Sequence, residues 1–389
     1  MKVLFLSNLY PNKEEPVRAT FNRQKIAHLK GRCDITVVAP VSWFPFKQAF
    51  CRKISRIPFK ESIDGMDVYH PRVFYTPKSF RFLYGLFYYL SIRPFVEKLR
   101  RDFDFDIIFC AWAYPDGLAA MKLAKTFKIP FVVLAHGSDV HFHTKSSLRR
   151  GLMKETFLKA DRVIAVSNEL KDRILGLGVP QEKVEVIYDG VDHELFRRED
   201  KDAAKEKLGL PRGRKTALFV GNLVSVKGLR FLLSAVSRIK ENDYSMHIIG
   251  GGYLERRLKG AVRALGLEDR VVFCGVRPHN EIPLWLNAAE FLCLPSLAEG
   301  LPDIIIEALS CGLPVVASRV GGVPEIINDE RIGILVEPKD VKALAGAIRS
   351  ALDKKWDKGY IQEQSRRFSW DENSRRIFEC LSSCLEAKL

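Results

Sequence analysis

The sequence predicts an α/β protein with two Rossmann-like, doubly wound domains that face a central cleft. Its 389 residues suit two domains of roughly 150–200 residues each. Short, nearly continuous apolar runs alternate with helical stretches, as in parallel sheets covered on both faces. This alternation occurs twice, before and after a charged stretch that contains no strand-like run.

The first domain is predicted over residues 1–196, with helices that include Phe21–Leu29 and Asp116–Phe127. The apolar run at the start of the sequence is too short for a signal peptide and is interpreted as a buried strand. The predicted strands are Val3–Ser7, Ile35–Ala39, Ile107–Cys110, Phe131–Leu134, Val163–Val166 and Val184–Ile187.

Residues 197–214 are rich in charge and are predicted to be a linker, and the second domain is predicted over 215–365. Its helices include Gly228–Ile239, Tyr253–Leu265 and Asp303–Ser310. Its predicted strands are Ala217–Val220, Ser245–Ile249, Val271–Cys274, Phe291–Leu294, Val315–Ala317 and Ile334–Val336. Ligands of open α/β sheets bind beyond the carboxyl ends of the strands, so we expect the ligand in a cleft that the carboxyl ends of both sheets face.

The formal net charge is +15, and residues 45–60 carry five basic and no acidic side chains. Such a surface attracts phosphates of nucleic acid, of an anionic bilayer or of a phosphorylated acceptor, or it is simply a solvated face. The aromatic stretch Phe80–Phe95 is too short to span a membrane. It suits either a segment at a bilayer surface or a helix packed on a sheet. No recognised nucleic-acid-binding motif is present, so we expect no nucleic-acid partner.

The eight cysteines form no CxxC pair. Without metal-ligand spacing or a secretory signal, they are interpreted as reduced thiols of a cytoplasmic protein. A zinc site at His136, His141 and His143 lacks a carboxylate or thiol to complete it, so no metal is expected.

The segment Pro295–Ile327 carries the most specific chemistry. A strand end leads through a Gly/Pro loop into a helix that opens at Pro302, and the N–H groups of such a helix start can hold a diphosphate. Glu299 lies before the helix and Glu307 lies inside it. Each carboxylate can accept two hydrogen bonds from vicinal hydroxyls of a ribose or a hexose.

This segment resembles the family-four retaining glycosyltransferases of GT-B fold (glycosyl transferases group 1), whose signature is EGxPxxxxEAxxxGxPVVxxxxGGxPE. Glu299 and Glu307 match its two glutamates. The resemblance implies that the chain moves a hexose-type sugar from a nucleoside-diphosphate (NDP) sugar to an acceptor, with retention of configuration and without a metal or other cofactor. The matching positions beside the glutamates are Gly300, Pro302, Ala308, Gly312, Pro314, Val315, Val316, Gly321, Gly322, Pro324 and Glu325.

The resemblance also assigns roles along the rest of the chain. His136 and Asp139, in a stretch similar to the family's HGxD turn, are expected beside the transferred sugar together with Glu299. Glu307 is expected to bind the donor ribose. The other expected donor-binding residues are Gly221, Asn222, Lys227, Gly251, Val276, Gly300, Leu301 and Pro302. The C-terminal residues 366–389 resemble a helix that crosses back to the first domain.

The chain departs from the family pattern in three places. Asn222 stands where an arginine usually neutralises the donor diphosphate. Tyr188 and Asp189 replace the Pro and Asn of the motif PNGVDxxxF. Residues 18–20 contain no glycine before Phe21, so the loop that they form is expected to lie differently.

We expect a UDP- or GDP-linked donor and a saccharide or lipid-linked acceptor, with the protein at the inner face of the membrane as one option. A related GT-B enzyme, such as a nucleotide-sugar epimerase or a phosphorylase, remains an alternative. A non-catalytic partner subunit of GT-B fold is a second alternative, favoured only by Asn222 and the basic charge.

Overall fold

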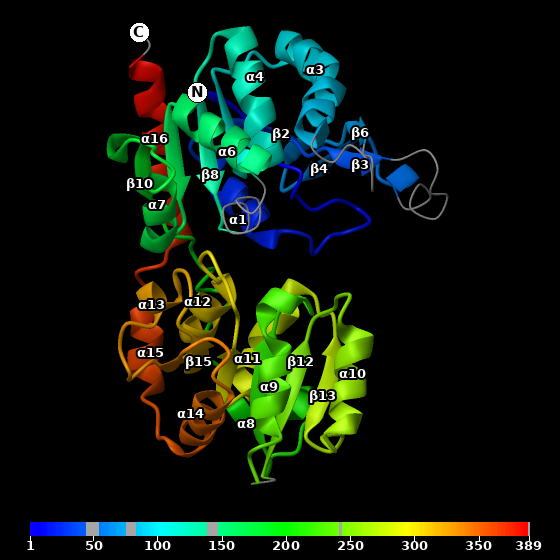
Figure 1. Cartoon of the computed structure of the whole chain (residues 1–389), viewed down its shortest axis with the longest axis vertical. Helices are drawn as coiled ribbons and strands as arrows, with labels where there is room; N and C mark the ends of the chain where they lie inside the picture. Colours follow the sequence, from blue (N-terminus) through cyan, green and yellow to red (C-terminus); the bar gives the residue numbers. More distant parts are fainter. Residues whose placement is uncertain (44–53, 75–82, 138–146, 241–242, 388–389) are drawn as a thin grey trace. The chain divides into compact units, whose positions relative to one another are not determined.

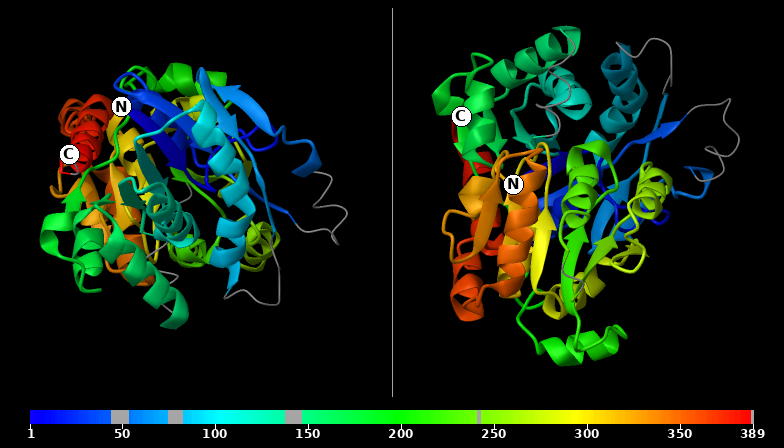
Figure 2. Two further views of the ribbon diagram at one scale, coloured as in Figure 1. Left: turned by 90° about the horizontal axis from the view of Figure 1, so that it is seen from above. Right: turned by 60° about the horizontal axis from the view of Figure 1, so that its bottom comes forward.

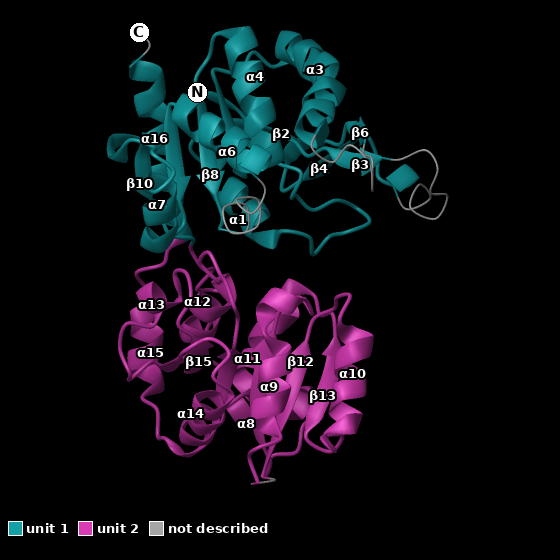
Figure 3. Ribbon diagram, in the orientation of Figure 1, with its two compact units in different colours: residues 1–189, 370–389 teal, residues 190–369 magenta. Residues whose placement is uncertain are grey.

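A computed structural model describes residues 1–43, 54–74, 83–137, 147–240 and 243–387. It divides into two compact units (Figure 3), unit 1 with Met1–Asp189 and Trp370–Leu389 and unit 2 with Gly190–Ser369. The boundary therefore lies at residue 190, several residues before the predicted end of the first domain at residue 196.

Unit 1 is built on a sheet of eight strands in the order β10-β9-β8-β7-β1-β2-β5-β4, in which only β4 runs antiparallel to its neighbour. Two further strands, β3 (Val41–Trp43) and β6 (Arg72–Phe74), form a separate parallel pair. The strands of the large sheet are β1 (Lys2–Leu6), β2 (Asp34–Val38), β4 (Lys60–Ile63), β5 (Met66–Tyr69), β7 (Ile107–Ala111), β8 (Phe131–Ala135), β9 (Arg162–Ala165) and β10 (Val184–Val186).

The order of strands reverses between β1 and β7, which makes this sheet doubly wound. Figure 1 labels several of its strands and the helices around them. Because parallel crossovers are right-handed, helices on the two sides of such a reversal cover opposite faces. Helix α1 packs on α16, while α4 packs on α3 and α6. The helices are α1 (Thr20–Leu29), α3 (Tyr84–Asp102), α4 (Leu118–Phe127), α6 (Ser147–Lys159), α7 (Asn168–Leu175) and α16 (Trp370–Glu386).

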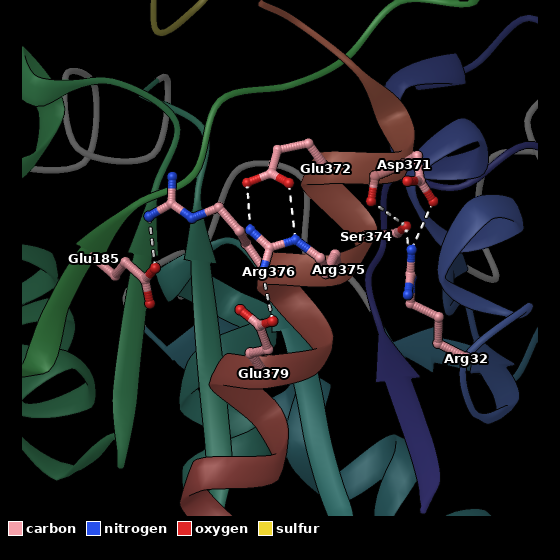
Figure 4. A network of polar contacts seen from close by, with 8 residues as sticks. All are labelled: Arg32, Glu185, Asp371, Glu372, Ser374, Arg375, Arg376 and Glu379. Carbon is pink, nitrogen blue, oxygen red and sulfur yellow. Dashed lines mark hydrogen bonds and ion pairs between the residues drawn. The ribbon is translucent and has the colours of Figure 1, made fainter.

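The C-terminal helix α16 belongs to unit 1, where polar contacts hold it at both flanks (Figure 4). Arg376 pairs with Glu185 of β10 at 2.6 Å, and Arg32 pairs with Asp371 at 2.6 Å. The ring of Trp370 stacks on His28 of α1. Exposed ion pairs contribute little each, so the buried apolar side of α16 supplies most of the stabilisation.

Unit 2 contains one parallel sheet of six strands in the order β13-β12-β11-β14-β15-β16, and its reversal lies between β11 and β14 (Figure 2). Its strands are β11 (Lys215–Val220), β12 (Tyr244–Ile249), β13 (Val271–Gly275), β14 (Phe291–Leu294), β15 (Val315–Ser318) and β16 (Gly333–Val336). Its helices are α8 (Lys201–Lys207), α9 (Leu229–Val236), α10 (Glu255–Ala264), α11 (Ile282–Ala288), α12 (Asp303–Ser310), α13 (Val323–Ile326), α14 (Val341–Asp353) and α15 (Lys358–Ser365).

Residues 197–214 do not form the predicted linker. Asp200 caps the helix α8 by accepting a hydrogen bond from the backbone N–H of Ala203, and α8 packs on α11 inside unit 2. The side chain of Lys205 is buried and donates to the carbonyl of Arg214 at 2.7 Å. The stretch was predicted as a linker because it is rich in charge, but it contains a short helix that Asp200 caps.

The aromatic stretch after residue 80 forms most of helix α3, which packs on α4 and β6 and continues through Pro94. Leu86 and Leu90 on its other side are exposed. Within the described part of the chain, no helix is long and apolar enough to cross a bilayer. Most of the basic stretch 45–60, including Arg52 and Lys53, lies outside the described residues.

A buried carboxyl group fixes the turn after β7. Asp116 accepts hydrogen bonds from the backbone N–H of Asn8 at 2.7 Å and from the hydroxyl of Tyr88 at 2.5 Å. Burial raises the pKa of Asp116 to about 7 despite these two donors. The group therefore connects the loop after β1, the turn after β7 and helix α3 at the carboxyl edge of the sheet.

We expect Asp116→Asn to make the protein more stable than the wild type at about pH 8 but not at about pH 5. Because folding raises this pKa from about 4, the folded protein keeps a proton that the unfolded chain has lost between about pH 4 and pH 7. Stability therefore falls as the pH rises through this window, by at most about 4 kcal/mol. An asparagine keeps the acceptor oxygen and removes this loss. Urea unfolding at both pH values measures the difference, and an equal effect of the substitution at both would contradict the assignment.

Candidate active site

In unit 2 the loops after β11 and β14 lie against each other at the carboxyl edge of the sheet. A Cβ atom at Gly228 would lie 1.8 Å from the carbonyl oxygen of Pro295, and Gly228 has φ +69°. The backbone N–H of Leu297 donates to the carbonyl of Val226 at 2.7 Å. Only glycine permits this approach, which brings the loop of Lys227 to the loop of Glu299.

The loop after β15 supports Glu299 from another direction. A Cβ atom at Gly321, which has φ +54°, would lie 2.0 Å from the carbonyl oxygen of Glu299. The N–H of Gly322 donates to the carbonyl of Gly300 at 2.7 Å. The Gly–Gly pair of the sequence motif thus holds the backbone of the Glu299 loop.

Lys227 and Glu299 form an ion pair, with 2.7 Å between Nζ and Oε1. Their side chains are 21% and 10% exposed, so a ligand can still reach both. A carboxylate beside the ammonium orients Lys227 and balances its charge in the absence of ligand. An anionic ligand at this place would share or replace that interaction.

Glu307 lies inside helix α12. Its carboxylate oxygen Oε1 lies 2.7 Å from Nε2 of His279, within hydrogen-bonding distance. The ring of His279 packs on Phe196 at 5.1 Å. His279 was not among the predicted site residues. The short turn that precedes α11 brings it to Glu307, and no motif in the sequence signals this contact.

Other predicted donor residues lie in the loops that follow β11, β12 and β13. Gly221 directly follows β11, and a Cβ atom built there would lie 3.8 Å from Cε of Lys227. Gly251 lies beside Val276, which is exposed. Asn222 is exposed in the loop after β11.

Helix α12 begins at Asp303, as predicted. Leu301 and Pro302 are buried, and Pro302 caps the helix without a side-chain hydrogen bond. Pro302 therefore offers no side-chain hydrogen bond to the first turn, in which Asp303 is the acidic residue.

In unit 1 the predicted residue His136 follows β8, and Nε2 of its ring lies 3.0 Å from Oδ1 of Asn22 on α1. Its ring also packs on Phe21 at 4.8 Å. Asp139, with His141 and His143, lies outside the described residues. Burial lowers the pKa of His136 well below its usual value, and the charge of Lys25 lowers it further.

The glycine-free loop before α1 retains a glycine-like backbone. Ala19 has φ 48° and ψ 49°, the left-handed conformation, directly before the first residue of the helix. A family glycine would adopt this conformation without the cost of about 1 kcal/mol or more that a Cβ atom adds. The chain thus adopts here a conformation that favours glycine, although the residue is alanine.

Each of the two α/β units contains a largely parallel sheet. In the second unit, glycine-lined loops and two glutamates, one paired with Lys227 and one with His279, define a glycosyltransferase of the GT-B class. Models of two families match the chain, Glycosyltransferase Family 4 over residues 18–195 and Glycosyl transferases group 1 over residues 200–376. The chain belongs to the family-four glycosyltransferases.

Several curated proteins and solved structures are similar to the chain. The putative teichuronic acid biosynthesis glycosyltransferase TuaC of Bacillus subtilis is 29% identical over 90% of this chain and 88% of its own length. The putative colanic acid biosynthesis glycosyltransferase WcaL of Escherichia coli is 28% identical over 72% of this chain and 70% of its own. Sucrose-phosphate synthase from Thermosynechococcus elongatus has the same fold, with a TM-score of 0.81, 20% identity and complete coverage of both chains. Anabaena HepE in complex with UDP-glucose has a TM-score of 0.78 and 22% identity over 98% of this chain and 100% of its own.

Proposed function

We propose that the protein is a retaining glycosyltransferase that moves a hexose-type sugar from a UDP- or GDP-linked donor to a glycan or lipid-linked acceptor. The observation that carries this proposal is the ion pair of Lys227 with Glu299 beside the start of α12, with Glu307 further along the same helix. The names of the relatives favour a role in the synthesis of cell-surface polysaccharide or glycolipid.

Each group has one task in the proposed reaction. The bond between the anomeric carbon and the diphosphate breaks through a state with oxocarbenium character, and negative charge grows on the departing NDP. Lys227, Asn222 and the start of α12 stabilise that charge, so the reaction needs no metal ion. Glu307 binds the ribose hydroxyls, and Glu299, His136 and Asp139 hold the transferred sugar in position.

A thermal-shift screen of EDTA-treated protein against UDP, GDP, ADP and their common sugar conjugates tests the donor site. A ligand at about 100 times its Kd stabilises the folded state by roughly 2.7 kcal/mol. One nucleotide family is expected to raise the melting temperature without metal. No shift with any nucleotide would favour a non-catalytic partner subunit, and conversion of the donor without acceptor would favour an epimerase.

The acceptor is proposed to lie at a membrane surface, on the cytoplasmic side. The exposed leucines of α3 and the basic stretch 45–60 favour contact with anionic lipid. Co-sedimentation with liposomes that contain anionic lipid, reduced at high salt, is the expected result. Equal recovery in the supernatant with and without these liposomes would contradict membrane contact.

We expect Asn222→Arg to tighten binding of the NDP about tenfold to a hundredfold. An arginine forms charge-assisted, bidentate contacts to phosphate worth about 1.5–3 kcal/mol, whereas asparagine donates one neutral hydrogen bond. Titration calorimetry measures the affinity, and Asn222→Gln controls for side-chain length. The gain should shrink as the salt concentration rises. An unchanged Kd would mean that position 222 does not face the diphosphate.

A further inference from the structure

Helix α1 of unit 1 carries two polar side chains on its buried side. Asn22 and Lys25 are both 0% exposed, and they lie beside the buried Ile26 and Leu29. Residues spaced three and four apart share one side of a helix, so these two polar groups occupy places where apolar packing would be expected. Asn22 contacts His136, and Lys25 follows Asn22 by three residues on the same side of the helix.

The contacts of Asn22 determine the tautomer of His136. Its Nδ2 group donates to the carbonyl oxygen of Leu9 at 2.8 Å, and since a carbonyl only accepts, the amide orientation is fixed. Oδ1 of Asn22 therefore faces Nε2 of His136 at 3.0 Å. An amide oxygen also only accepts, so Nε2 must carry the hydrogen. In the neutral ring the lone pair then lies on Nδ1.

Lys25 supplies a buried positive charge near the same ring. Its Nζ atom lies 2.7 Å from Oδ1 of Asp189, and these side chains are 0% and 3% exposed. Asp189 stands where the family motif has asparagine, so the ion pair accompanies a departure of this chain from the pattern. Buried ion pairs are often no more stable than neutral replacements, so stability alone does not explain this one.

The charged and polar groups around His136 come from separate elements. Among the described residues, Lys25 is the charged group whose field acts on the imidazole. Lys25 is balanced by Asp189, which follows β10. Asn22 supplies the acceptor, and the ring of Phe21 covers one side. Desolvation and the nearby ammonium both oppose protonation of the imidazole.

We propose that Asn22 and the Lys25–Asp189 ion pair are positioning residues that hold His136 as a neutral imidazole with hydrogen on Nε2 and a lone pair on Nδ1. A neutral Nδ1 accepts a hydrogen bond from a sugar hydroxyl, whereas a protonated ring cannot. This inference rests on the proposed function only for the identity of the hydroxyl. The state of the ring is a property of the protein without ligand.

The tautomer can be measured by nitrogen NMR of protein labelled with ¹⁵N-histidine, with the His136 signals assigned by their loss in His136→Gln. The wild type is expected to show a protonated Nε2 and an unprotonated Nδ1. Asn22→Leu removes the acceptor and is expected to give a mixture of tautomers. Asn22→Asp keeps an acceptor oxygen toward Nε2 but replaces the donor to the Leu9 carbonyl and adds a negative charge, so Nε2 should stay protonated while the ring takes up a second proton at higher pH than in the wild type. A protonated Nδ1 in the wild type, or the same pattern in Asn22→Leu, would overturn the role of Asn22.

The ion pair is tested with the double variant Lys25→Met/Asp189→Asn. Removing both charges avoids leaving one buried charge unpaired, which would itself threaten folding. His136 of the double variant is expected to take up a proton at higher pH than in the wild type, while Nε2 still donates to Asn22. The role of Lys25 would be contradicted if His136 took up its proton at the same pH in both proteins, or took up none in either.

Activity separates this inference from the proposed function. With UDP-glucose or whichever donor stabilises the protein, Asn22→Leu should lower kcat about tenfold to a hundredfold, as misplacement of a site group by about 1 Å does. The expected NMR pattern with unchanged activity in His136→Gln would uphold the positioning of His136 and refute its proposed role in transfer.

Discussion

Glu299→Ala is expected to lower turnover at least about a hundredfold while nucleotide binding is preserved or strengthened. Its carboxylate is proposed to hold hydroxyls of the transferred sugar, an interaction of the kind whose loss costs about 10²-fold to 10³-fold. The same carboxylate neutralises Lys227 in the ligand-free protein. Its removal leaves the ammonium free to bind phosphate, so the Kd of the NDP should not rise.

Release of NDP from the donor, measured beside calorimetric NDP binding, separates these two effects. Glu337→Ala is a matched control, because Glu337 is an exposed glutamate of the same unit that pairs with Arg319 at the surface. Circular dichroism checks that the fold is intact. Turnover of Glu299→Ala near that of the control would refute the assignment of Glu299.

Lys227→Met should give the second large loss, about a hundredfold to a thousandfold in kcat/KM. The reason differs from that for Glu299, because Lys227 is proposed to stabilise the charge of the departing diphosphate. The Kd of the NDP should therefore rise and the rate should fall. Lys342→Met, at an exposed lysine of α14, controls for the loss of one positive charge from unit 2.

The two substitutions should not be additive. Lys227 and Glu299 touch at 2.7 Å, and residues in contact couple. Glu299→Ala in the Lys227→Met background should cost less than in the wild type, because part of the task of Glu299 is to orient Lys227. Fully additive losses would mean that the ion pair has no part in the reaction.

The sequence predicts the sheet of unit 2 well because its inner strands β12, β14 and β15 are buried on both faces. Phe291–Leu294 was predicted with both ends correct, and the start of α12 at Asp303 was also correct. Here an apolar run stops abruptly at a Gly/Pro loop, and Pro302 marks the start of the helix. The start of α4 was less accurate, because the turn over Ala113–Gly117 delays the helix to Leu118.

Contacts between distant residues could not be predicted. Glu307 and His279 are 28 positions apart, and Lys25 and Asp189 are further apart still. No local pattern encodes such pairs. The spacing of Asn22, Lys25, Ile26 and Leu29 did contain a signal, because it places two polar side chains on the apolar side of a helix. A buried lysine requires a partner, so this spacing would have indicated an acidic residue elsewhere in the chain without identifying which one.

The most direct test of a metal-independent transferase is ³¹P NMR of UDP- and GDP-sugars incubated with EDTA-treated protein and a membrane glycolipid extract as acceptor. We expect the diphosphate-ester signals of one donor family to be replaced by those of the free NDP, and Lys227→Met to abolish this change. Intact donors throughout, or release of NDP only when a divalent metal is restored, would contradict this expectation.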